Sequence, residues 1–226
     1  MSNFVIILGK SGSGKSTSIK TLDPKATFIL NVLGKNLPFK GSASAYSKDN
    51  NNMARTSKAA NIIKWIQHID AERPEITTLV LDDIIYSMRE EFFDRRKERG
   101  YDKYSDIGGN FRDIIAAARN ARNDLNIYAM MHNEDIISDG SVIGTKVSTI
   151  GKLVDEKYNP LENVTATLQC QPKYDENGRP VYGFYTHTLQ VNGVPLAAKT
   201  PAGMFEEDFI PNDLALVNEK MKEYYN

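Results

Sequence analysis

The sequence contains a single cysteine, Cys170, and no marked excess of either charge. One cysteine excludes an internal disulfide and favours a reducing compartment such as the cytoplasm. The 28 basic and 29 acidic residues give a formal net charge of -1, so nucleic-acid binding would need a local basic patch. No apolar run approaches the roughly 20 residues that cross a bilayer, and the run near the N-terminus lacks the basic flank of a signal peptide. These absences predict a soluble protein of the cytoplasm that does not enter a membrane.

Apolar runs alternate with helical patterns along the first part of the chain. The runs at residues 4–8, 27–32, 77–81 and 126–131 predict strands that are buried on both faces. Between the second and third runs, Ile62, Ile66 and Ile69 recur at the spacing of a helix. Strands separated by helices predict an α/β fold with a mostly parallel sheet that is flanked by helices.

The amino-acid composition of the sequence changes after about residue 159. The segments on either side of Asn177-Gly178 are rich in Thr, Val, Tyr and Phe, which predicts a β-hairpin with an Asn-Gly turn. A terminal helix is expected from about Asn212. We therefore predict one domain over 1–226, with a core at 1–159 that carries the motifs described next and a strand-rich extension plus C-terminal helix at 160–226. Two segments, 34–55 and 101–110, are predicted to be irregular.

Residues 9–17 match the pattern Gly-x4-Gly-Lys-Ser, placed between an apolar strand and an expected helix. Backbone N–H groups of such a loop surround phosphate oxygens, and the N-terminus of the following helix adds a positive dipole. Lys15 would reach the β- and γ-phosphates, Ser16 would bind magnesium, and the Thr17 N–H would reach the α-phosphate. A glycine-rich turn with a chance lysine is the alternative, and it explains neither the preceding strand nor the spacing. The predicted ATP-binding residues are Gly9, Lys10, Ser11, Gly12, Ser13, Gly14, Lys15, Ser16 and Thr17.

Two carboxylates, Asp82 and Asp83, follow the apolar run at 77–81. The carboxyl ends of parallel strands border the ligand in open α/β sheets. Asp82 is therefore the predicted acid on the magnesium side, together with Ser16. Asp83 has two interpretations: a general base that polarises the attacking water, or the N-cap of a helix that starts at residue 84.

His132 follows the run at 126–131 and is expected at the same edge of the sheet. A polar side chain there can sense the γ-phosphate and transmit its loss to the next loop. An ordinary surface histidine at a strand end is the equally simple alternative.

The order of phosphate loop, Asp-Asp strand, polar strand end and β-rich tail resembles the RecA-like branch of P-loop ATPases. More narrowly, the chain is similar to bacteriophage RecA-like ATP-binding proteins that are linked to single-strand annealing and recombination. Beyond the phosphate loop, the similarity lies in residues 37–41, 99–103, 149–157 and 210–214.

The resemblance implies a magnesium-dependent ATPase that acts on single-stranded DNA in recombination or replication, as a homo-oligomeric ring or filament. It places DNA at two expected loops, 101–110 and 134–146, and the protein in the host cytoplasm if the chain is viral. One departure from the family concerns the water-activating glutamate after the second strand, where this chain has Asn31. That role would then fall to Asp83 or to a neighbouring subunit.

Two other functions remain open from the sequence. One is a P-loop kinase for a nucleotide or another small acceptor, which the β-rich tail disfavours. The other is a nucleotide-dependent switch that binds ATP without efficient hydrolysis, which the missing glutamate favours.

Overall fold

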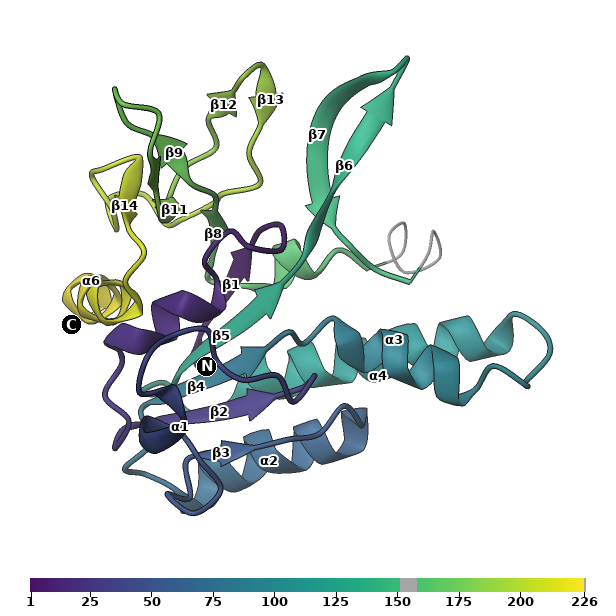
Figure 1. Cartoon of the computed structure of the whole chain (residues 1–226). Helices are drawn as coiled ribbons and strands as arrows, with labels where there is room; N and C mark the ends of the chain where they lie inside the picture. Colours follow the sequence, from purple (N-terminus) through teal and green to yellow (C-terminus); the bar gives the residue numbers. More distant parts are fainter. Residues whose placement is uncertain (151–157, 226) are drawn as a thin grey trace.

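An eight-stranded sheet forms the centre of the molecule in the computed structural model, which describes residues 1–150 and 158–225 (Figure 1). The strand order is β14-β11-β8-β1-β5-β4-β2-β3, and the six strands from β8 to β3 pair in parallel, whereas β11 and β14 are antiparallel. This arrangement confirms the predicted α/β fold with a mostly parallel sheet. The strands are β1 (Asn3–Leu8), β2 (Thr27–Asn31), β3 (Met53–Ala54), β4 (Thr78–Asp82), β5 (Asn126–Met131), β8 (Ala166–Cys170), β11 (Gly183–Tyr185) and β14 (Phe209–Pro211).

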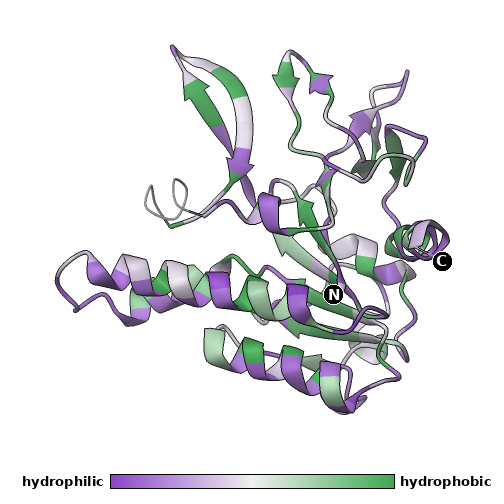
Figure 2. Cartoon of the chain, turned by 180° about the vertical axis from the view of Figure 1, so that it is seen from behind, coloured by the Kyte–Doolittle hydropathy of each residue, from purple (hydrophilic) through white to green (hydrophobic). Residues whose placement is uncertain are grey.

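Helices cover both faces of this sheet (Figure 2). Helices α2 (Ala59–Glu72), α3 (Tyr86–Asp94) and α4 (Asp102–Asn120) pack on one face. The 3-10 helix η1 (Ser16–Thr21) and α6 (Leu214–Tyr225) pack on the other. Successive side chains of β1 alternate between these two cores, as the period of a strand requires. All the strands that carry the predicted site are therefore held from both sides.

Two segments that were expected to be loops, 101–110 and 134–146, are regular elements in the structure. Residues 102–110 begin α4 instead of forming a loop, because Ile107 and Phe111 are buried in the core and this packing outweighs the poor helix propensity of Gly108-Gly109. Residues 134–146 belong to a hairpin of β6 (Asn133–Ser138) and β7 (Ser141–Val147) that projects from the sheet (Figure 1). Its turn has Asp139 and Gly140 at φ 50° and 77°, which is the Asp-Gly signature of a two-residue hairpin turn.

The C-terminal third adds strands to the same sheet through β8, β11 and β14. The Asn-Gly turn joins β9 (Lys173–Tyr174) to β10 (Pro180–Val181), as predicted. A second small hairpin pairs β12 (Gln190–Val191) with β13 (Val194–Pro195). The remaining short elements are α1 (Ser42–Ala45) in the 34–55 segment and the 3-10 helix η2 (Pro160–Asn163). None of the described helices is long and apolar enough to cross a membrane.

Candidate functional site

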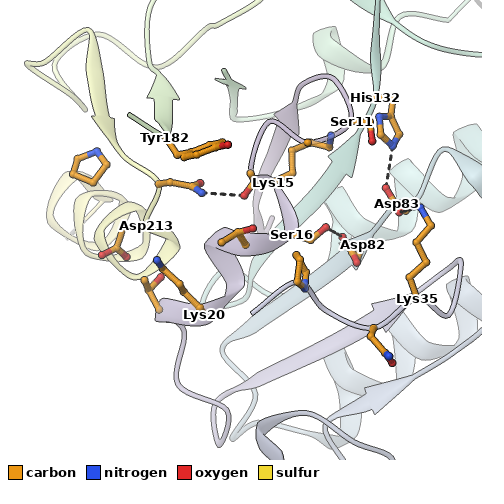
Figure 3. Close-up of a pocket in the computed structure, with 18 residues that line it drawn as sticks. Ser11, Lys15, Ser16, Lys20, Lys35, Asp82, Asp83, His132, Tyr182 and Asp213 are labelled. Atoms are coloured by element: carbon orange, nitrogen blue, oxygen red, sulfur yellow. Dashed lines mark hydrogen bonds and ion pairs between the residues drawn. The ribbon is translucent and has the colours of Figure 1, made fainter. Parts of the chain in front are cut away.

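The candidate site is a pocket of 760 Å³ at the carboxyl ends of β1, β4 and β5 (Figure 3). In the sheet, β5 lies between β1 and β4. The phosphate loop after β1, the carboxylates after β4 and the histidine after β5 therefore meet at one edge. Six of the nine predicted loop residues line the pocket: Ser11, Gly12, Gly14, Lys15, Ser16 and Thr17.

The other three loop residues support the loop from behind. A Cβ atom on Gly9 would lie 2.3 Å from the Cys170 carbonyl oxygen of β8, so only glycine fits between these strands. The Ser13 hydroxyl is buried and has no partner among the described residues. Lys10 Nζ lies 2.7 Å from Asp135 Oδ2 and ties the loop to the β6–β7 hairpin.

Gly14 is constrained by both its backbone and its surroundings. Its φ is +104°, a conformation that side chains disfavour. A Cβ there would lie 2.8 Å from Asn212 Nδ2 and 3.1 Å from the Tyr182 ring. The loop expected to start a full α-helix leads instead into the short η1, which still directs the N–H groups of its first turn toward the pocket.

The Lys15 ammonium is folded back onto its own loop. Its Nζ donates to the Gly9 carbonyl at 2.7 Å and to the Lys10 carbonyl at 2.9 Å. Burial lowers the pKa of this ammonium, and the nearby carboxylates of Asp82 and Asp83 oppose that shift. Two backbone carbonyl oxygens thus accept hydrogen bonds from this ammonium, and it forms no direct ion pair with a described carboxylate.

Ser16 and Asp82 are in direct contact. The Ser16 hydroxyl donates to Asp82 Oδ1 at 2.7 Å, and Asp82 is only 5% exposed. Burial raises the pKa of the Asp82 carboxyl to about 6, and the negative charge of Asp83 adds to this while the Ser16 hydrogen bond opposes it. Two oxygen ligands side by side are suited to Mg²⁺, which prefers carboxylate, hydroxyl and phosphate oxygens.

Asp83 adopts a left-handed backbone conformation with φ 58°. A non-glycine residue in this region stores strain of about 1–2 kcal/mol. The α3 helix begins only at Tyr86, and its N-cap is Ile85, so Asp83 is not the N-cap. Its side chain instead contacts His132 Nε2 at 3.2 Å and Lys35 Nζ at 3.5 Å (Figure 3).

The charge state of Asp83 follows from these neighbours. Burial alone would raise the pKa of its carboxyl. The hydrogen bond from His132 and the charges of Lys35 and Lys15 outweigh that cost and hold the pKa below its ordinary value. Asp83 is therefore an ionised acceptor at neutral pH, better suited to orient a water than to keep its proton.

Sequence reasoning missed Lys35. This residue is positioned by Asn31, whose side chain accepts from the Gly34 N–H at 2.7 Å and donates to the Lys35 carbonyl at 2.6 Å. Asn31 thus shapes the loop that carries a cation to the acidic end of the pocket. Asn31, the polar residue at the end of β2, is a typical turn residue. The local sequence does not indicate, however, that the Lys35 side chain lies beside Asp83.

The C-terminal extension supplies a wall of the pocket that the sequence did not reveal. Tyr182, Pro211, Asn212 and Asp213 line the side away from Asp83 (Figure 3). Asn212 Nδ2 donates to the Gly14 carbonyl at 3.0 Å, which fixes this wall to the phosphate loop. In the sequence, residues 210–214 are part of the family resemblance, but no local pattern there indicates a contact with the phosphate loop. The 149–157 stretch of that resemblance lies, from residue 151 on, outside the described residues.

These features fit a nucleotide and its magnesium ion. The loop has the open backbone that phosphates need, Lys15 lies within it, and an adjacent oxygen pair can accept a hard cation. An aromatic ring and polar groups lie at the opposite end of the pocket. This combination defines a P-loop nucleotide-binding protein.

The family model described as "AAA domain" matches residues 2–187. The chain belongs to this family, whose P-loop domains are associated with ATP binding and hydrolysis. No curated protein is similar enough to this chain to count as a match.

Proposed function

We propose that the chain is a magnesium-dependent ATPase with a RecA-like organisation. The observation that carries the proposal is the Ser16–Asp82 hydrogen bond, because it brings the two expected metal ligands together beside Lys15. Ser16 and Asp82 would hold the magnesium ion, whose positive charge would stabilise the negative charge of the phosphates.

Three further residues would have distinct roles in the reaction: Lys15, Asp83 and His132. Lys15 would contact the β- and γ-phosphates, and Asp83 would accept a hydrogen bond from the attacking water and align it. His132 lies next to Asp83 and directly precedes β6. It would sense whether the γ-phosphate is present and pass that state to the β6–β7 hairpin.

The biological setting of the proposal rests on the resemblance. It suggests a cytoplasmic protein of a phage-type recombination or replication system, assembled as a ring or filament and stimulated by single-stranded DNA. Phosphate release should then increase when single-stranded DNA is added, and the protein should form larger species with a non-hydrolysable ATP analogue.

Two substitutions test the chemistry. Lys15→Ala should abolish ATP binding, because Lys15 is the buried ammonium within the phosphate loop, whereas Lys20 and Lys35, which also line the pocket, are exposed and lie outside that loop. Asp83→Asn should retain magnesium-ATP binding but lose most phosphate release, because the amide is a weaker acceptor for water. Asp102→Asn, at an exposed position in α4, is the matched control. Undiminished hydrolysis in Asp83→Asn would exclude Asp83 from the reaction, and full activity in Lys15→Ala would refute the ATPase.

A further inference from the structure

A groove leads away from the nucleotide pocket toward the β3 edge of the sheet. Its larger part is a hollow of 730 Å³ bounded by the loop after β2, α1, β3 and α2. A smaller hollow of 350 Å³ continues over α2, and the two share Arg55 and Trp65. Lys35 and Asn36 line both the larger hollow and the nucleotide pocket. We call this continuous feature the β3–α2 groove.

The β3–α2 groove is lined by basic side chains. Among the described residues that line it there is no Asp or Glu. The two ends of the basic row have acidic neighbours, since Lys35 lies near Asp83 and His68 lies 3.3 Å from Glu72. The cations between them are exposed, and their side chains form no ion pair or hydrogen bond with any residue that the structure describes: Lys48, Arg55 and Lys64. Uncompensated positive charge in a concave surface favours a polyanion.

An aromatic platform lies where the two hollows meet. Trp65 packs on Phe28 with ring centroids 4.9 Å apart and an interplanar angle of 31°, and it remains partly exposed to both hollows. Asn61, Lys64 and His68 lie on the same face of α2 because they are three or four residues apart. Basic groups around a fixed aromatic ring are the arrangement by which proteins bind unpaired bases and their phosphates.

The segments implied by the resemblance offer a poorer surface for DNA. At the tip of α3 and α4, Arg95 is paired with Glu91, Glu98 and Asp106. In the β6–β7 hairpin, Asp135 is paired with Lys10, and Glu134 is paired with Lys146. Phosphates would have to displace the acidic partners of Arg95, Lys10 and Lys146. Arg99 at the tip is also exposed without an ion pair to any described residue, whereas the β3–α2 groove combines such cations with Trp65 in one hollow.

We propose that the β3–α2 groove binds a single-stranded nucleic acid. A base stacks on Trp65, and Lys48, Arg55 and Lys64 contact the phosphates. The connection to ATP turnover rests on the proposed function, since Lys35 lies between the groove and Asp83. Binding itself does not require hydrolysis and can be measured without it.

Trp65 provides its own probe, because it is the only tryptophan of the sequence. Oligothymidylate of about eight nucleotides should quench its fluorescence, and thymidine monophosphate should quench far less at equal phosphate concentration. Arg55→Ala and Lys64→Ala should each weaken binding several-fold and reduce the salt slope by about 0.7. Arg99→Ala is the matched control, since Arg99 is exposed at the tip between α3 and α4.

The outcomes separate the groove from the ATPase. Quenching that depends on strand length and on Arg55 and Lys64 supports the groove, even if ATP is not hydrolysed. Equal quenching by the mononucleotide would overturn the single-strand assignment and point to a phosphoryl acceptor. Absence of quenching, or a loss of binding in Arg99→Ala alone, would also overturn it while leaving ATP hydrolysis untouched.

Discussion

Replacement of Asp82 by asparagine should stabilise the protein while removing the carboxylate of the proposed magnesium site. Asp82 is buried, and burial raises the pKa of its carboxyl from 3.8 to about 6. Ionising this group in the folded state is therefore harder than in the unfolded chain. A difference of about two pKa units corresponds to about 3 kcal/mol. The neutral amide of Asp82→Asn keeps an oxygen that can accept the Ser16 hydroxyl, but it does not carry the buried charge.

The pH dependence has a defined sign. Between about pH 4 and pH 6 the folded state holds a proton on Asp82 that the unfolded chain has released. The wild-type protein without ligand thus loses stability as the pH rises through this window. The advantage of Asp82→Asn should be about 3 kcal/mol near pH 8 and roughly half of that near pH 5. Near pH 8 that gain should raise Tm by about 6–12 °C.

Urea unfolding without nucleotide or magnesium, at both pH values, measures this effect. Asp102→Asn should show no such gain, since Asp102 is exposed. A companion titration should find magnesium-dependent ATP binding weakened in Asp82→Asn. The electrostatic reasoning fails if this variant is no more stable than the wild type near pH 8, or if its gain is the same at both pH values.

Three further substitutions test the walls of the pocket. Gly14→Ala should lower the free energy of unfolding by about 1–3 kcal/mol more than Gly41→Ala does. Both glycines have positive φ, but of the two only Gly14 has atoms within 4 Å of the added Cβ. Equal losses of stability would contradict this packing. Thr21→Val should lower stability by about 1–2 kcal/mol in urea unfolding, because the Thr21 hydroxyl accepts the first N–H groups of α6, and Thr21→Ser should restore it. Tyr182→Ala should raise the KM for ATP about tenfold if the ring stacks on the base, whereas Tyr174→Ala, outside the pocket, should leave KM unchanged.

The parts of the site that could be predicted are those that local sequence determines. The phosphate loop is a contiguous motif, so its residues were identifiable without any knowledge of the fold. Asp82 and His132 were predictable for a different reason. Each follows a continuous apolar run, and parallel strands bring their carboxyl ends to one edge whatever their order in the sheet.

The parts that could not be predicted depend on long-range packing. Asn212 contacts Gly14 across 198 positions of sequence, and no local pattern specifies such a contact. Lys35 was hidden in a segment predicted to be irregular, because its position depends on the turn that Asn31 organises. The two segments expected to be loops, 101–110 and 134–146, were assigned wrongly for opposite reasons. In α4, burial of apolar side chains outweighs the low helix propensity of the glycines. In the β6–β7 hairpin, the Asp-Gly pair that predicts a hairpin turn was present in the sequence but was not interpreted as one.

Burial disfavours both central charges of the pocket. Burial lowers the pKa of Lys15 and raises that of Asp82, so each group resists the charge that its proposed role requires. They do not neutralise each other by direct contact, because Lys15 bonds to loop carbonyls and Asp82 to Ser16. A phosphate would compensate the lysine, and a magnesium ion would compensate the carboxylate. Because a phosphate alone would leave the buried Asp82 carboxylate without a direct cationic partner, we expect the pocket to bind the nucleotide more tightly together with magnesium than without it.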